Sequence, residues 1–287
     1  MTQNKYCLLG YASGVAGVDT HAGDAPMIVQ QSPFLKSSDY QWTSMVHPLQ
    51  DKSIIDTVSH VCTALAKDVA ELVTKQKTFT VIGGDHTAAI GTWSGVHYAL
   101  QNDLGLIWID AHMDSHTPET TLSGRLHGMP LACLLGYGYP ALTGILEQTP
   151  KIKPENVCLI GVRSFEEGEA ALLAKLNVRI YFIEEVKQRG IAEVLQEAIT
   201  QVSKNTVGYG ISLDLDAIDP KNAPGVDVPE LNGVNDQALL NALKIVAADP
   251  RLIATEIVEF DPSRDMYQKT EKLITELLDI FRNGKNT

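Results

Sequence analysis

The chain has 287 residues, 44% of them hydrophobic, which is enough to bury a large core, and one domain over residues 1–287 is expected. A formal net charge of −12 and a pI near 5.1 argue against nucleic acid and anionic membranes as partners. The N-terminal stretch lacks the apolar segment of a secretory signal, and no stretch approaches the roughly 20 apolar residues of a membrane span. Four scattered cysteines are typical of reduced thiols and favour the cytoplasm: Cys7, Cys62, Cys133 and Cys158.

Short apolar runs alternate with helical patterns along the chain, which predicts an α/β fold with a doubly wound, mostly parallel sheet. Most runs are continuously apolar, as expected for strands covered on both faces. The expected strands are residues 5–12, 78–84, 104–110, 156–162, 178–183, 210–216 and 252–260. The expected helices are residues 54–73 and, approximately, 190–203, 235–247 and 268–283. Residues 13–50, rich in Gly, Ser and Pro, are expected to form a long irregular segment.

Ligands of such sheets bind at the carboxyl ends of the strands, and three stretches place polar residues there. The first is "TVIGGDHTAAIG", residues 80–91, where Gly83 and Gly84 permit a tight turn before Asp85 and His86. A plain strand-to-helix turn, with Asp85 as the cap, explains this stretch equally well.

The second stretch is "IDAHMDSH", residues 109–116. Side chains two residues apart on an extended chain point the same way, so Asp110, His112 and Asp114 can converge, and His116 continues the spacing. The alternative is a hydrogen-bonded histidine among aspartates that stabilise a turn.

The third stretch is "ISLDLDAIDP", residues 211–220, where Asp214 and Asp216 share one face and Asp219 suits a turn. Four buried carboxylates need cations, and no cluster of Lys or Arg accompanies them. Two divalent metal ions are therefore expected. A set rich in carboxylates favours Mn²⁺, although Zn²⁺, Co²⁺ and Fe²⁺ are chemically compatible. Two such ions that share a solvent molecule would produce a bridging hydroxide near neutral pH.

Five motifs resemble those of the ureohydrolase superfamily, and of arginases most: "GGDHT", "DAHMDSHTP", "SGRLHGMP", "SLDLDAIDP" and "VEFDP". They occur in the same order, from about residue 77 to 265. The resemblance implies a three-layer α/β/α sandwich that forms one catalytic domain and assembles as homotrimers or homohexamers. It also implies that His86 and Asp114 bind one Mn²⁺, that His112 and Asp216 bind the other, and that Asp110 and Asp214 bridge both.

The resemblance gives two further residues a catalytic role. His127 matches a histidine that shuttles protons or protonates the leaving amine, as an imidazole can near neutral pH. Taken without the resemblance, it is a structural loop histidine. Glu259 matches the glutamate that holds the guanidinium, and the alternative is an exposed Glu at a strand end, as Glu256 is expected to be. The implied reaction is attack of a metal-bridging hydroxide on the guanidinium carbon, with a proton delivered through Asp114 or His127.

The residues expected to hold the substrate's tail depart from the arginase pattern. Ser123 matches a residue that contacts the α-carboxylate, but His116 and Arg125 stand where arginases usually carry Asn. Ser164 and Glu166 replace the aspartates near the α-amino group. L-Arginine is the first expected substrate, with agmatine, guanidinobutyrate and formiminoglutamate as alternatives.

The sequence leaves two alternatives to a ureohydrolase. The chain could be a non-hydrolytic, metal-binding regulatory homologue, although all the expected metal and catalytic positions are intact. A single-metal deacetylase on a similar fold is disfavoured, because it would not need the second set of ligands formed by His86 and Asp114.

Overall fold

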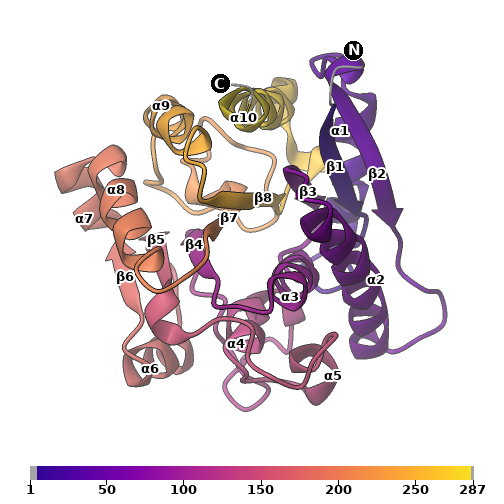
Figure 1. Ribbon diagram of the computed structural model, residues 1–287, viewed down its shortest axis with the longest axis vertical. Coiled ribbons are helices and arrows are strands. Elements are labelled where there is room, and N and C mark those ends of the chain that lie inside the picture. Colours follow the sequence, from indigo (N-terminus) through magenta and orange to yellow (C-terminus); the bar gives the residue numbers. More distant parts are fainter. Residues whose placement is uncertain (1–4, 286–287) are drawn as a thin grey trace.

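The computed structural model describes residues 5–285, which form one central sheet and the helices around it (Figure 1). The strands are β1 (Tyr6–Tyr11), β2 (Tyr40–Val46), β3 (Phe79–Gly83), β4 (Gly105–Ile109), β5 (Val157–Val162), β6 (Arg179–Phe182), β7 (Tyr209–Asp214) and β8 (Leu252–Val258). All pair in parallel, in the order β2-β1-β3-β8-β7-β4-β5-β6. The expected α/β class is therefore confirmed, and the sheet is parallel throughout.

Helices cover both faces of the sheet and make the outer layers of the sandwich (Figure 1). One face carries α1 (Ala25–Gln31), α7 (Ile183–Arg189), α8 (Ile191–Val202), α9 (Asp236–Ala247) and α10 (Lys269–Gly284). The other carries α2 (Ile54–Thr74), α3 (Ala88–Leu100), α4 (Pro130–Leu134), α5 (Pro140–Thr143) and α6 (Glu167–Lys175). Among residues 5–285, none of the helices is both long and apolar enough to span a bilayer.

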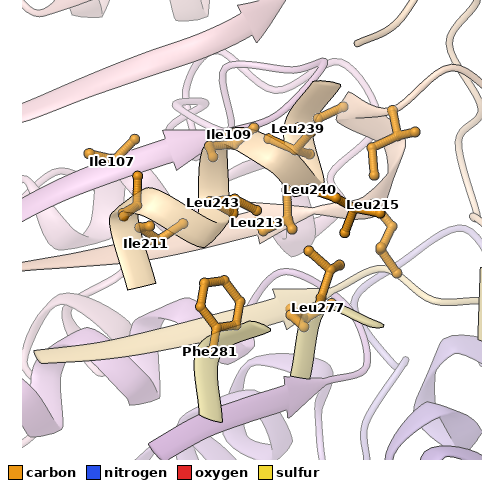
Figure 2. Packing of buried hydrophobic residues seen from close by; sticks show 14 of the residues in the cluster. Ile107, Ile109, Ile211, Leu213, Leu215, Leu239, Leu240, Leu243, Leu277 and Phe281 are labelled. Atoms are coloured by element: carbon orange, nitrogen blue, oxygen red, sulfur yellow. The ribbon is translucent and has the colours of Figure 1, made fainter. Parts of the chain in front are cut away.

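Alternating strand side chains supply the two cores. From β4 and β7, Ile107, Ile109, Ile211 and Leu213 all point to one face. There they pack against apolar side chains of α9 and α10 (Figure 2): Leu239, Leu240, Leu243, Leu277 and Phe281. The intervening residues Leu106 and Trp108 point to the other face. Burial on both faces explains why these strands are continuously apolar.

The expectation of an irregular segment over residues 13–50 is wrong. It contains α1 and the edge strand β2, which pairs with β1. The sequence of β2, "YQWTSMV", mixes polar and apolar residues because an edge strand is only partly covered, so it lacks the apolar run that marks the inner strands. All seven expected strands and all four expected helices are present, with their ends moved by a few residues.

The topology brings four central strands together as neighbours: β3, β8, β7 and β4. The three stretches that carry the predicted ligands follow β3, β4 and β7, and Glu259 follows β8. Because all four strands run in parallel, their carboxyl ends meet at one edge of the sheet, where a doubly wound fold binds its ligands.

Candidate metal centre and substrate pocket

His86 follows Gly84 by two residues, and at Gly84 the backbone passes close to the backbone of Ser13. A Cβ atom at Gly84 would lie 2.1 Å from the Ser13 carbonyl oxygen, so only glycine fits there. The imidazole is buried and stacks on Trp108, with ring centroids 4.2 Å apart. Its Nδ1 atom faces three carboxylate oxygens, at 2.9 Å from Asp114, 3.1 Å from Asp214 and 3.3 Å from Asp110.

His112 forms a second group around the same carboxylate. Its Nδ1 lies 3.0 Å from Asp216 Oδ2 and 3.6 Å from Asp110 Oδ1. Asp110 therefore turns one oxygen toward each histidine, and N–H donors of Trp108 (2.8 Å) and His112 (2.7 Å) fix its orientation. Two sets of ligand atoms result, and they share Asp110: His86, Asp110 and Asp114 in one, and Asp110, His112 and Asp216 in the other.

The hydrogen bond at Nε2 of His86 indicates that Nδ1 is available as a metal ligand. Ser212 Oγ–H donates to Glu256 Oε2 (2.8 Å), so the serine oxygen accepts from His86 Nε2–H at 3.0 Å. That leaves the lone pair of the neutral ring on Nδ1, which is buried and has no hydrogen-bond partner among residues 5–285. A lone pair aimed at three carboxylate oxygens can be satisfied by a cation between them, so the donor set fits a metal ion.

Three of the four carboxylates, those of Asp114, Asp214 and Asp216, have raised pKa values, whereas for Asp110 burial is outweighed by the two histidines, which lower the pKa. Burial, followed by the charge of Asp110, raises the pKa of Asp114 to about 7. Burial and Asp216 raise the pKa of Asp214 well above its usual range. Although burial opposes it, the nearby carboxylates raise the pKa of His86, so a proton neutralises the cluster when no cation does. A divalent cation would replace that proton and keep the carboxylates charged.

Glu256 corrects one expectation. It is not an exposed residue at a strand end: it lies inside β8, is fully buried and accepts hydrogen bonds from Ser212 and Thr92. The alternation within β8 turns this side chain toward His86 and not toward solvent, because both faces of a central strand are covered. Glu256 is thus joined to the metal site through one serine.

Glu259 and His127 meet beside the cluster. Glu259 has a left-handed backbone (φ 63°), and its Oε1 accepts from the His86 backbone N–H at 2.7 Å. His127 Nδ1 lies 3.2 Å from the same oxygen. Burial lowers the pKa of His127, but contact with Glu259 outweighs it and raises the pKa to about 9. Glu259 Oε2 is buried without a hydrogen-bond partner among residues 5–285, so one strong acceptor is left for a ligand.

A pocket of about 310 Å³ opens above these groups. Its lining includes metal-cluster residues, His127 and Glu259 together with all four predicted tail residues: His116, Ser123, Arg125 and Glu166. Val18 forms part of the wall, so the segment of residues 13–50 closes one side of the pocket. The Ala16 backbone anchors it there by donating to the buried Asp85 carboxylate at 3.1 Å.

Comparison with known proteins agrees with this geometry. The arginase family's sequence model matches residues 21–281. The chain belongs to the arginase family. The arginase of Bacillus caldovelox is 43% identical over 216 residues, which cover 75% of this chain and 71% of that protein. The arginase of Brevibacillus brevis is 39% identical over 236 residues, covering 82% and 79%. The crystal structure of Bacillus cereus arginase superposes with a TM-score of 0.90 at 30% identity, covering 98% of both chains.

Family membership confirms the ureohydrolase resemblance and makes the chain a metal-dependent hydrolase of the arginase type. Four residues around the site of this arginase-family chain were missed from the sequence: Trp108, Ser212, Glu256 and Glu230. Ser212 and Trp108 could have been found, because each lies two residues before a predicted aspartate ligand and so shares its face. Glu230, on the loop after β7, carries no such signal.

Proposed function

We propose that this protein hydrolyses the guanidinium group of L-arginine to give L-ornithine and urea, using two Mn²⁺ ions. The single observation that carries the proposal is the free oxygen of Glu259. This buried carboxylate oxygen, which has no hydrogen-bond partner within the described part of the chain, lies in a pocket beside two groups of atoms that could hold metal ions. That arrangement suits a cationic, planar group with N–H donors, which is what a guanidinium presents.

We assign the six ligands as follows: His86 and Asp114 to one ion, His112 and Asp216 to the other, and Asp110 and Asp214 to both. The two oxygens of Asp110, each turned toward a different histidine, support its bridging role. Ions held by a carboxylate-rich set would activate water as a nucleophile near neutral pH. Mn²⁺ suits this set best.

The chain's own residues then position the substrate and move protons. Glu259 pairs with the guanidinium and holds its carbon toward the metal cluster, which removes the entropy cost of aligning the reactants. Addition of water to that carbon and cleavage of one C–N bond release urea and an amine. His127, protonated at neutral pH because Glu259 raises its pKa, is placed to give the amine its proton, with Asp114 as the other candidate donor.

We place the substrate's tail against His116, Ser123, Arg125 and Glu166, which line the outer pocket. Agmatine, guanidinobutyrate and formiminoglutamate are the alternative substrates. We also propose that the chain acts in the cytoplasm, which four buried cysteines free of disulfides support. The proposed assembly, a homotrimer or homohexamer, rests on the family resemblance alone.

The test is urea or amine release from L-arginine, agmatine, guanidinobutyrate and formiminoglutamate, assayed in parallel with Mn²⁺-loaded protein. We expect L-arginine to give the highest kcat/KM. A clear preference for agmatine would overturn the choice of substrate. Asp114→Asn separates an enzyme from a non-hydrolytic homologue, because the enzyme should lose both turnover and metal, whereas a regulatory subunit should keep its partner.

A further inference from the structure

We infer that the outer pocket recognises the carboxylate of a substrate's tail and gains little from an α-ammonium group. The substrate class would then be ω-guanidino carboxylates, with arginine as one member and its deamino analogue, 5-guanidinopentanoate, as another. The inference rests on the proposed function and narrows it. It follows from the pairing of charged groups that line the outer pocket.

The imidazole of His116 is committed to Glu166. Thr120 Oγ1 accepts from the Thr117 backbone N–H (2.9 Å) and lies 3.1 Å from His116 Nδ1. If the ring is neutral, the threonine hydroxyl donates to Nδ1, and if the ring is protonated, Nδ1–H donates to the threonine oxygen. In both states Nε2 carries a proton and donates to Glu166 Oε2, with which it is in direct contact.

This contact occupies the carboxylate oxygen that an ammonium group would need. His116 is buried and held on both ring nitrogens, so it cannot turn away without losing two hydrogen bonds. A substrate ammonium would have to displace it from Glu166. The exchange replaces one charge-assisted hydrogen bond with another, so the net gain is small.

Of the other carboxylates of the outer pocket, Glu169 is engaged by hydrogen bonds and Glu230 is directed toward the metal cluster. Glu169 accepts from the backbone N–H groups of Ser115 (3.2 Å) and Glu166 (3.0 Å), one on each oxygen. Glu230 Oε1 lies 3.8 Å from Nε2 of His112, so its charge faces a proposed metal ligand. Two further residues that line this pocket, Ser164 and Phe165, are uncharged.

A free cation remains for a carboxylate. Arg125 is exposed at the pocket, and within residues 5–285 its guanidinium makes no hydrogen bond or ion pair. Its backbone N–H donates to Ser123 Oγ (3.2 Å), which holds the two predicted tail residues together. A guanidinium binds a carboxylate in a bidentate, charge-assisted pair. Arg125 is therefore available, among the described residues, to pair with a carboxylate in the outer pocket.

Binding of two product-like compounds tests the inference without turnover. L-Ornithine and 5-aminopentanoate differ only in the α-amino group, and calorimetry on the Mn²⁺-loaded protein gives both Kd values. We expect them to agree within about threefold. His116→Asn should free Glu166 and improve ornithine binding about tenfold relative to 5-aminopentanoate, whereas Glu166→Gln should leave the ratio near that of the wild type.

The opposite pattern would overturn the inference. A tenfold or larger preference of the wild-type protein for ornithine, abolished by Glu166→Gln, would show that Glu166 binds the ammonium group. Urea release from L-arginine but tenfold less from 5-guanidinopentanoate would overturn the inference and leave the proposed function intact. If neither product-like compound bound and no guanidino compound released urea, both would fail.

Discussion

In the proposed function, Glu259 is the residue on which substrate binding depends most. Its left-handed backbone is an unfavourable conformation for a residue other than glycine, and two contacts hold it: the Glu259 N–H donates to the Gly84 carbonyl (2.8 Å), and Oε1 accepts from the His86 N–H. The cost of such a conformation is of order 1–3 kcal/mol, and it persists where the surrounding contacts enforce it. The result is one engaged oxygen and one free oxygen.

We predict that Glu259→Gln lowers kcat/KM for L-arginine by about 100-fold, or about 2.7 kcal/mol, because it removes a charge-assisted pair with the guanidinium. Metal content, measured by elemental analysis, should stay at the wild-type value. Glu155→Gln is the control, since Glu155 is exposed on the surface. Loss of metal together with activity would mean that Glu259 supports the ligand cluster and not the substrate.

His127 should leave a pH signature in stability. Its pKa is raised from 6.5 to about 9 through contact with Glu259, so the folded state holds the proton more tightly than the unfolded chain. The stabilisation is full below about pH 6.5 and is lost as the pH rises through about 9. We predict that the difference in unfolding free energy between the metal-free wild-type protein and His127→Asn shrinks over that interval, as measured by urea denaturation. A difference that does not vary with pH would refute the pairing.

At the scale of elements, β7 and β8 carry the support of the metal site inside the sheet. Ser212 of β7 links His86 to Glu256 of β8. Groups that orient a metal-bound histidine in this way typically contribute 10- to 100-fold in metal affinity, because they fix the ring and its tautomer.

Ser212→Ala should therefore weaken Mn²⁺ binding by about 10- to 100-fold in a competition assay with a chelator. Ser94→Ala is a matched control, because Ser94 is also buried but its hydroxyl has no hydrogen-bond partner among residues 5–285. Equal Mn²⁺ affinity in the two variants would contradict the proposed support.

The elements also show where the sequence suffices. The inner strands could be predicted because burial on both faces leaves continuous apolar runs. β2 could not, since its partial exposure removes that signal. That Asp110, His112 and Asp114 lie together could be predicted from their spacing, although β4 ends at Ile109 and the backbone of Asp114 is left-handed (φ 47°) rather than extended. Glu256 shows where the sequence does not suffice: a charge in an apolar run predicts an exposed strand end, but here hydrogen bonds from Ser212 and Thr92 satisfy the carboxylate inside the sheet.

At the scale of the whole molecule, the order of the strands determines which residues come together in the site. β3 and β4 follow one another in the sequence but flank β8 and β7 in the sheet, so residues from 86 to 259 meet at one edge. No local pattern gives that order. The resemblance to a known family predicted which residues meet there but not the order of the strands. The contact between His116 and Glu166 likewise becomes visible only in the structure.

Metal binding should be linked to global stability, because four buried carboxylates repel one another without cations. We predict that removing metal with EDTA lowers the Tm and that Mn²⁺ restores it. Each bound ion should add about 2.7 kcal/mol of unfolding free energy at 100 times its Kd. Asp114→Asn should show a much smaller shift in calorimetry. A Tm unaffected by Mn²⁺ in the wild-type protein would argue against a metal centre at this edge of the sheet.

The most direct test of the central claim is urea release from L-arginine while Mn²⁺ is titrated into metal-free protein. We predict that activity follows metal loading and reaches its maximum at two ions per chain. Absence of urea at every metal loading, from L-arginine and from every other guanidino compound, would contradict the proposed function.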